Sequence, residues 1–161
     1  MHSRIFGIIK KDNYDKIIKE EGEISIPIQE FGQNLPYVMN YVSDETNLDE
    51  DIEWLINELK VDSNKFKYNP ETHTIKFYLG FAEDYFKKKW EYLKELVETE
   101  NAFRQFCRSD SFSFEIRDTA ESHYEFYQCN EKGYYSTFDG FVRALDYDVE
   151  YVIFGSLDYC S

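Results

Sequence analysis

The sequence predicts an α+β fold: a single compact domain over residues 1–161, in which a mainly antiparallel sheet packs with about three to five helices. Segments with the two-residue apolar period of strands interleave irregularly with segments of helical period. A length of 161 residues suits one domain. The hydrophobic share of 42% includes fourteen Phe and fourteen Tyr, which is enough to build a substantial core.

The N-terminal segment predicts a strand followed by a helix. Residues 4–10 are largely apolar and predict the first strand. Residues 12–20 predict a helix with Asp12 as its N-cap, because Asp accepts hydrogen bonds from the first turn. Gly22 is expected to end this helix, since glycine adopts the left-handed conformation of a C-cap without strain.

A second strand and a second helix are predicted next. Residues 23–28 alternate Ile with other residues and predict an edge strand that contains a proline. Residues 29–43 have few periodic signals and are expected to be mostly loop. Asn47 is placed to cap a helix with one apolar stripe. The stripe consists of Leu48, Ile52, Leu55, Ile56 and Leu59.

The middle of the chain predicts a hairpin and the longest helix. Two short strands within residues 65–79 flank an Asn-Pro-Glu turn. The longest helix is expected near residues 81–99, with a short continuation at residues 102–107. The predicted apolar face of the long helix comprises Tyr85, Phe86, Trp90, Leu93, Leu96 and Val97.

The C-terminal part of the chain is predicted to be rich in sheet. Alternating patterns indicate strands at residues 112–117 and 124–127, and a further strand begins at Tyr134. Residues 137–146 predict a short helix, and the apolar run at residues 149–154 predicts the final strand.

Charge narrows the function more than any motif does. The 32 acidic residues outnumber the 18 basic residues, which gives a formal net charge of −14. Such a field attracts basic surfaces and opposes direct binding to nucleic acid or anionic membranes. The surplus lies at the two ends of the chain, whereas the middle third is almost neutral and carries the run Lys87-Lys88-Lys89. We expect this run to be a solvent-exposed helix face with i,i+4 partners.

Residues able to act as nucleophile or base are scarce. His2 lies at the terminus, and His73 and His123 are the other histidines. Because His123 and Cys129 would lie about 20 Å apart on an extended strand, they cannot form a catalytic pair. The sequence therefore predicts no catalytic residues, and we expect that the chain is not an enzyme.

Metal and cofactor motifs are not found in the sequence. There is no Cys-x-x-Cys, no His-Glu-x-x-His and no glycine-rich phosphate loop. Residues 44–51 are rich in carboxylates but lack the glycine that a calcium loop needs. Cys107, Cys129 and Cys160 are expected to be free thiols, consistent with a cytoplasmic location. No cofactor or metal is predicted, and no apolar run reaches the roughly 20 residues of a membrane span.

Two acidic segments are candidate surfaces for a protein partner. Tyrosine gives a rigid contact with a polar tip, and carboxylates pair with basic side chains. The alternative for each tyrosine is a place in the core. The first segment comprises Asp146, Tyr147, Asp148, Glu150 and Tyr151, with Asp158 and Tyr159. The second comprises Asp49, Glu50, Asp51 and Glu53 around Trp54.

In size, acidity and tyrosine content the chain resembles small acidic bacterial immunity proteins, such as the inhibitors of streptococcal NAD glycohydrolases. The lysine-, isoleucine- and asparagine-rich composition is typical of an AT-rich bacterial or phage genome. The resemblance implies a cytoplasmic antitoxin that binds a cognate toxin enzyme, either an NAD glycohydrolase or a nuclease, and blocks its basic active-site cleft. It extends to overall size and composition and assigns no role to any single residue.

Three other functions are compatible with the composition. An acidic inhibitor of restriction or CRISPR effectors could mimic DNA, which requires carboxylates spaced like phosphates along an elongated face. An enzyme that uses a pair of carboxylates is the second alternative, because 32 acidic residues provide many candidate pairs. A housekeeping binding module also remains open.

Overall fold

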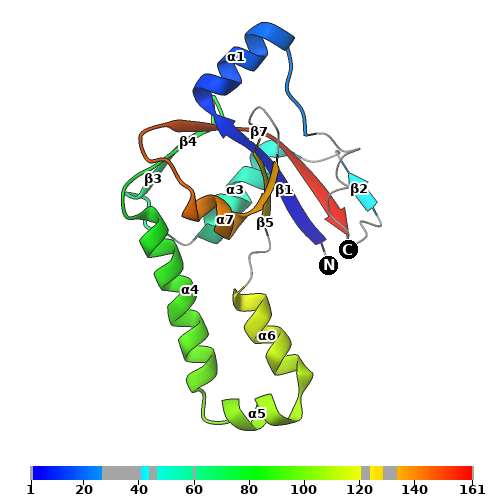
Figure 1. The fold of residues 1–161 in the computed structure, drawn as a ribbon, viewed down its shortest axis with the longest axis vertical. Coiled ribbons are helices and arrows are strands. Elements are labelled where there is room, and N and C mark those ends of the chain that lie inside the picture. Colours follow the sequence, from blue (N-terminus) through cyan, green and yellow to red (C-terminus); the bar gives the residue numbers. More distant parts are fainter. Residues whose placement is uncertain are drawn as a thin grey trace.

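The computed structural model describes residues 2–26, 41–43, 47–59, 61–120, 124–128 and 134–160. It confirms the α+β class (Figure 1). These residues contain six helices, one more than the upper expected number. The helices are α1 (Lys11–Glu21), α3 (Leu48–Leu59), α4 (Phe81–Glu98), α5 (Ala102–Arg108), α6 (Asp110–Ala120) and α7 (Phe138–Arg143). The strands are β1 (His2–Lys10), β2 (Tyr41–Ser43), β3 (Phe66–Asn69), β4 (Thr74–Phe77), β5 (Tyr124–Gln128), β6 (Tyr134–Thr137) and β7 (Glu150–Cys160).

The strands form one mainly antiparallel sheet, as the sequence predicts. Their order is β3-β4-β7-β1-β5-β6, and β2 pairs with the C-terminal end of β7. Only β1 and β5 run parallel to each other among the described pairs. The first and last described strands are therefore neighbours at the centre of the sheet. They pair from His2 opposite Cys160 to Lys10 opposite Tyr151, and the register shifts by one residue between Gly7 and Ile8.

Strand β1 is buried on both of its faces. Ile5, Phe6, Ile8 and Ile9 are all buried, the pattern of a central strand covered on both sides. Gly7 lies opposite Gly155 on β7. A Cβ atom at Gly7 would lie only 2.5 Å from ring carbons of the Phe154 side chain. Gly7 therefore leaves room for an aromatic ring that covers this face of the sheet.

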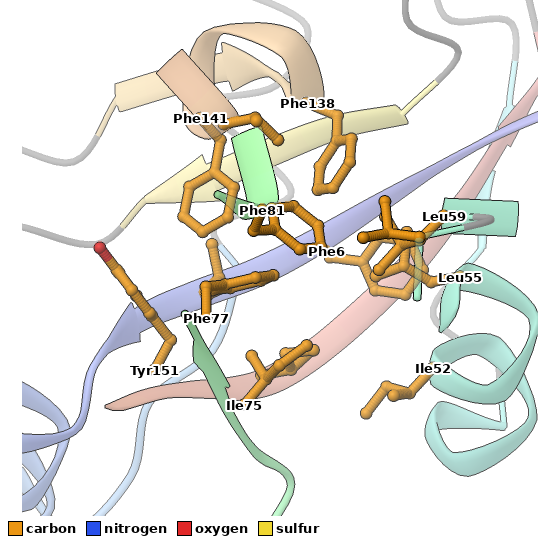
Figure 2. Packing of buried hydrophobic residues seen from close by; sticks show 14 residues of the cluster. Phe6, Ile52, Leu55, Leu59, Ile75, Phe77, Phe81, Phe138, Phe141 and Tyr151 are labelled. Atoms are coloured by element: carbon orange, nitrogen blue, oxygen red, sulfur yellow. The ribbon is translucent and has the colours of Figure 1, made fainter. Parts of the chain in front are cut away.

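The core on the other face is built from aromatic rings. Figure 2 shows Phe77, Phe81, Phe141 and Tyr151 gathered between the strands and the helices that cover them. Phe77 packs edge-to-face against Phe81, with ring centroids 4.6 Å apart, and against Phe141 at 5.9 Å. Offset and edge-to-face arrangements suit the charge distribution of the rings. The cluster thus joins β4 and β7 to the start of α4 and to α7.

Helices α4, α5 and α6 form an arm that extends away from the sheet and turns back (Figure 1). We call residues 81–120 the arm. Phe81 anchors its base in the core, and Phe112 is buried within it. Trp90 is 68% exposed and Val97 50% exposed, so the expectation that both lie on a buried face of the long helix is wrong. Within the arm α4 packs against α5 and α6, and these two side chains remain at the surface.

The strand predicted at residues 112–117 is a helix, α6. The alternation of Phe112, Phe114 and Ile116 also fits a helix, because residues four apart share one face. Phe112 and Ile116 lie on the buried side, whereas Phe114 lies on the other side and is 46% exposed. The segment packs against α4 instead of joining the sheet, so the two-residue period was misleading.

Other local predictions near the N-terminus need correction. Helix α1 begins at Lys11, so Asp12 lies within its first turn and is not the N-cap. Residues 23–26 do not form a strand, and the rest of that predicted strand lies outside the described residues. Of the expected loop at residues 29–43, Tyr41–Ser43 is strand β2 and the remainder lies outside the described residues.

Several capping and turn signals are confirmed. Gly22 has φ 82° and ends α1. The backbone N–H of Glu50 donates to Asn47 Oδ1 at 3.4 Å, at the start of α3. The backbone N–H of Glu71 donates to Asn69 Oδ1 at 3.0 Å in the hairpin turn. These short polar side chains satisfy backbone donors that the helix or strand ladder leaves unpaired.

The packing predicts opposite outcomes for two aromatic truncations on α4. Phe81→Ala removes a ring at the centre of the core and should lower the free energy of unfolding by about 3–5 kcal/mol. Trp90→Ala removes a ring that is mostly in water and should change it by less than about 1 kcal/mol. Urea denaturation followed by circular dichroism measures both values. A larger loss for Trp90→Ala than for Phe81→Ala would contradict this placement of α4.

Candidate functional site

Helix α3 presents opposite chemistry on its two sides. Ile52, Leu55 and Leu59 are buried in the core cluster. Glu50 and Glu53 lie on the opposite side of the helix and are exposed. The sequence pattern predicts this division, because apolar residues recur every three or four positions while acidic residues occupy the remaining face. The helix is therefore fixed to the body by one side and displays carboxylates on the other.

Asp51 is the exception among the acidic residues of α3. It is only 4% exposed, and its Oδ1 lies 2.9 Å from Arg4 Nη1. Ser156 Oγ donates to the other carboxylate oxygen at 2.7 Å. Asp51 therefore ties α3 to β1 and β7. The expectation that it belongs to an exposed acidic surface is wrong, because its carboxylate is buried and bonded inside the protein.

Arg4 also holds Trp54 in place. Its guanidinium carbon lies 4.6 Å from the centroid of the Trp54 ring, within the range of a cation–π contact. Trp54 is 36% exposed, so the indole is supported from one side and accessible from another. We call Glu50, Glu53 and Trp54 the α3 surface.

Asp49 lies at the edge of the α3 surface and contacts the hairpin. His73 Nε2 lies 2.7 Å from Asp49 Oδ1, although 24 residues separate the two in the chain. Burial raises the pKa of Tyr68 on β3, and the negative charge of Asp49 raises it further. His73 has φ 51°, in the left-handed region, and lies in the turn between β3 and β4. The pair connects the start of α3 to the β3–β4 turn.

The C-terminal acidic segment is arranged differently, because its tyrosines face inward. Tyr151 is buried in the core cluster, so the expectation that it belongs to an exposed surface is wrong. Its hydroxyl oxygen accepts a hydrogen bond from the backbone N–H of Asp146 at 3.0 Å. Tyr147 is half-buried, and its hydroxyl oxygen accepts from the backbone N–H of Ala82 at 3.3 Å. Both hydroxyl groups therefore bond to the backbone of this protein and stabilise its fold.

The carboxylates of this segment lie among basic side chains. Asp146 Oδ2 lies 2.8 Å from Lys10 Nζ, and the hydrogen bond from Lys10 lowers the pKa of Asp146. Glu150 is exposed and stands opposite Lys76 in the pairing of β4 with β7. Asp148 is also exposed. The net negative charge of this segment is thus partly neutralised locally, unlike that of the α3 surface.

The remaining candidates lie at the other end of β7. Asp158 is half-buried and pairs in register with Arg4 on β1. Tyr159 lies on β7 opposite Ser3 and Val42, and its side chain is outside the described residues. The acidic candidates of the sequence therefore separate into the α3 surface, the partly neutralised segment around Asp146, and the end of β7.

A polar cluster at the base of the arm was missed by the sequence reasoning. Lys89 Nζ lies 2.6 Å from Asp139 Oδ2, and the Tyr85 hydroxyl donates to Asp139 Oδ1 at 2.9 Å. Lys89 is therefore largely buried, so the expectation that all three lysines of its run are solvent-exposed is wrong. No sequence signal pairs residues that are 50 positions apart. The cluster fastens α4 to α7 and fixes the direction of the arm.

The described ranges can be compared with what metal ions, small molecules and membranes require. Within them, no three His, Cys, Asp or Glu side chains are grouped as they would be around a metal ion. A shallow hollow of about 510 Å³ is lined by Asp110, Ser111, Ser113, Phe114 and Arg117, all from α6. No helix in the same ranges is long and apolar enough to cross a membrane. Cys107 is an exposed free thiol on α5, whereas the side chains of Cys129 and Cys160 lie outside the description.

Comparison with known protein families, curated proteins and solved structures finds no match to this chain.

The contact between Lys10 and Asp146 predicts a specific titration. In Lys10→Met the pKa of Asp146 should rise toward the ordinary aspartate value, because the hydrogen bond that stabilises its charged form is lost. Since the native pKa is lowered, the pair stabilises the fold above the unfolded-state pKa of about 3.9, and this contribution disappears as pH falls through the lowered native value.

NMR titration of the side-chain carboxyl groups measures this change. Lys11→Met is the matched control, because Lys11 pairs with Asp15 and leaves Asp146 untouched. An unaltered Asp146 titration in Lys10→Met would contradict the pairing.

Proposed function

We propose that this chain is an inhibitory binding protein of the immunity type, which acts in the cytoplasm. It docks the α3 surface into the basic active-site cleft of a cognate bacterial toxin and blocks access of substrate. The observation that carries the proposal is the α3 surface itself, on which Glu50 and Glu53 are exposed beside a partly exposed Trp54. The buried Asp51 fixes this helix to the body through its contact with Arg4.

Rigid support makes the α3 surface suitable for tight binding. A preorganised surface loses little conformational freedom when it binds. The inner side of α3 is anchored in the core by Ile52 and Leu55, and Asp51 links it to both central strands. Tryptophan is enriched among residues that dominate binding energy, especially when polar groups surround it. Trp54 would act as the anchor, with Glu50 and Glu53 at its rim.

Electrostatics supports a basic cleft as the binding site. A toxin that acts on NAD or on nucleic acid must bind phosphate groups, so its active site carries positive charge. A net charge of −14 accelerates encounter with such a cleft. The carboxylates of α3 would then occupy positions that the substrate's phosphates use, and the inhibitor needs no chemistry of its own.

The α3 surface supports a cleft-blocking inhibitor better than a mimic of long DNA. Helix α3 has 12 residues and is therefore about 18 Å long. Duplex DNA presents one phosphate about every 3.4 Å along each strand. A helix of this length matches a few phosphates, which suits a dinucleotide or a short stretch of nucleic acid within an active site.

The proposal is tested with the enzyme encoded by the neighbouring gene. Co-expression should yield a stable complex, protect the host cell, and abolish turnover at a one-to-one ratio. A neighbouring enzyme that keeps full activity at saturating concentrations of this protein would reject the proposed function.

Charge reversal locates the interface. Glu50→Lys with Glu53→Lys should slow association with the toxin by about tenfold or more, because the attracting charges face the cleft. Trp54→Ala should mainly accelerate dissociation, since it removes the anchor. Surface plasmon resonance at several salt concentrations measures both rates, and circular dichroism checks that each variant folds.

Asp148→Lys with Glu150→Lys is the matched control. Each reversal adds two charges, so both double variants change the net charge from −14 to −10. Any general effect of the field is therefore the same in both, and only the local effect differs. A larger loss of association rate in the control would move the interface to the C-terminal acidic segment.

A further inference from the structure

The tip of the arm exposes aromatic side chains next to basic ones. Phe103 is 82% exposed and Phe106 is 58% exposed on α5. They lie three positions apart and therefore share one face of the helix. Arg104 and Arg108 are exposed on the same short helix. We call Phe103, Arg104, Phe106 and Arg108 the arm tip.

The arm tip is locally basic, although the chain as a whole is acidic. Residues 101–109 contain these two arginines and no acidic residue, whereas the whole chain carries −14. The α3 surface has the complementary character, with two exposed carboxylates and an accessible indole. Arginine pairs with carboxylates and stacks on tryptophan, and the Phe rings add apolar area.

The two surfaces of one molecule cannot meet. Figure 1 shows α5 at the end of the arm, farthest from the sheet, while α3 lies within the body. The direction of the arm is fixed by Phe81 in the core and by the contact of Lys89 with Asp139. The arm tip of one copy can therefore reach an α3 surface only on another copy.

We propose that a second copy of this chain covers the arm tip. The arm tip of each copy packs on the α3 surface of the other, and the two contacts are equivalent by a two-fold axis. A reciprocal exchange of this kind closes the assembly at two copies, which is the commonest symmetry of oligomers. The inference rests on the α3 surface being the docking surface of the proposed function.

The area on offer suits such a dimer. Two Phe side chains at these exposures provide on the order of 300 Å² of apolar surface, a size at which exposed patches commonly mark interaction sites. Each copy contributes one arm tip and one α3 surface, so the buried area is doubled. With the arginine, glutamate and tryptophan side chains included, the area that each copy buries approaches the roughly 800 Å² per partner of a standard interface.

The dimer would regulate the proposed inhibitor. A second copy and the toxin occupy the same α3 surface, so they bind in competition. Binding of the toxin then requires dissociation of the dimer, and the protein is stored with its acidic docking surface covered. The dissociation constant of the dimer then sets the toxin concentration at which the toxin complex replaces the dimer.

Sedimentation velocity on the purified chain tests the dimer without any toxin. The wild type should show a concentration-dependent mass of two copies. Phe103→Ser with Phe106→Ser should raise the dimer dissociation constant at least about tenfold for each ring removed. Leu79→Ser is the matched control, because Leu79 is 81% exposed outside the arm tip. It should leave the dimer unchanged.

A charge exchange identifies what the arm tip contacts. Arg104→Glu with Arg108→Glu should weaken the dimer about tenfold or more, and Glu50→Arg with Glu53→Arg should do the same. Mixing these two variants, or combining all four substitutions in one chain, should restore association, because opposite charges then face each other again. Circular dichroism confirms that every variant folds.

Three outcomes would overturn the inference. The wild type could remain monomeric at all concentrations. A dimer could be weakened by the arm-tip substitutions and unaffected by those on α3, which would mean that two tips pack together. Assemblies larger than two copies would mean an open chain of contacts. A negative result here rejects the dimer only. Binding of the toxin is tested separately by the association and dissociation rates of the α3 variants, so each proposal can fail without the other.

Discussion

The antiparallel pairing of β1 with β7 is the contact on which the rest of the structure depends. It joins the two ends of the chain at the centre of the sheet, so every other element is inserted between two neighbouring strands. The same pair supplies Arg4 and Ser156, each of which contacts one carboxylate oxygen of Asp51. The orientation of α3, and with it the acidic surface proposed to bind a partner, follows from how these strands align.

Burial divides the acidic residues into groups with different uses. Asp51 and Asp139 are buried and each contacts a basic side chain and a hydroxyl group, which offsets the cost of removing a carboxylate from water. Asp146 is partly exposed and contacts a lysine. Glu50 and Glu53 are exposed at the surface of α3. Of the carboxylates behind the formal charge of −14, some therefore lie exposed to solvent, while others of the same type stabilise the fold.

The arm and the body are built under different constraints. The body buries aromatic rings between a sheet and its helices, with Phe77 and Phe81 at the centre. The arm is a layer of helices with a small interior around Phe112, so several of its apolar side chains remain in contact with water. Exposed aromatic rings on a projecting element are costly in an isolated molecule. That cost is the physical reason to expect a second surface against the arm tip.

Local patterns in the amino-acid sequence are enough to predict most of the described helices and strands and the acidic side of α3. Local rules are enough for these features: periodicity gave α3, α4 and the hairpin, and Asn47 and Gly22 marked helix ends. Tertiary structure alone decided that α6 is a helix, that Tyr151 and Asp51 are buried, that Trp90 is exposed, and that Lys89 contacts Asp139. Each of these depends on which segment packs against another across many intervening residues, and a period or a composition does not carry that information.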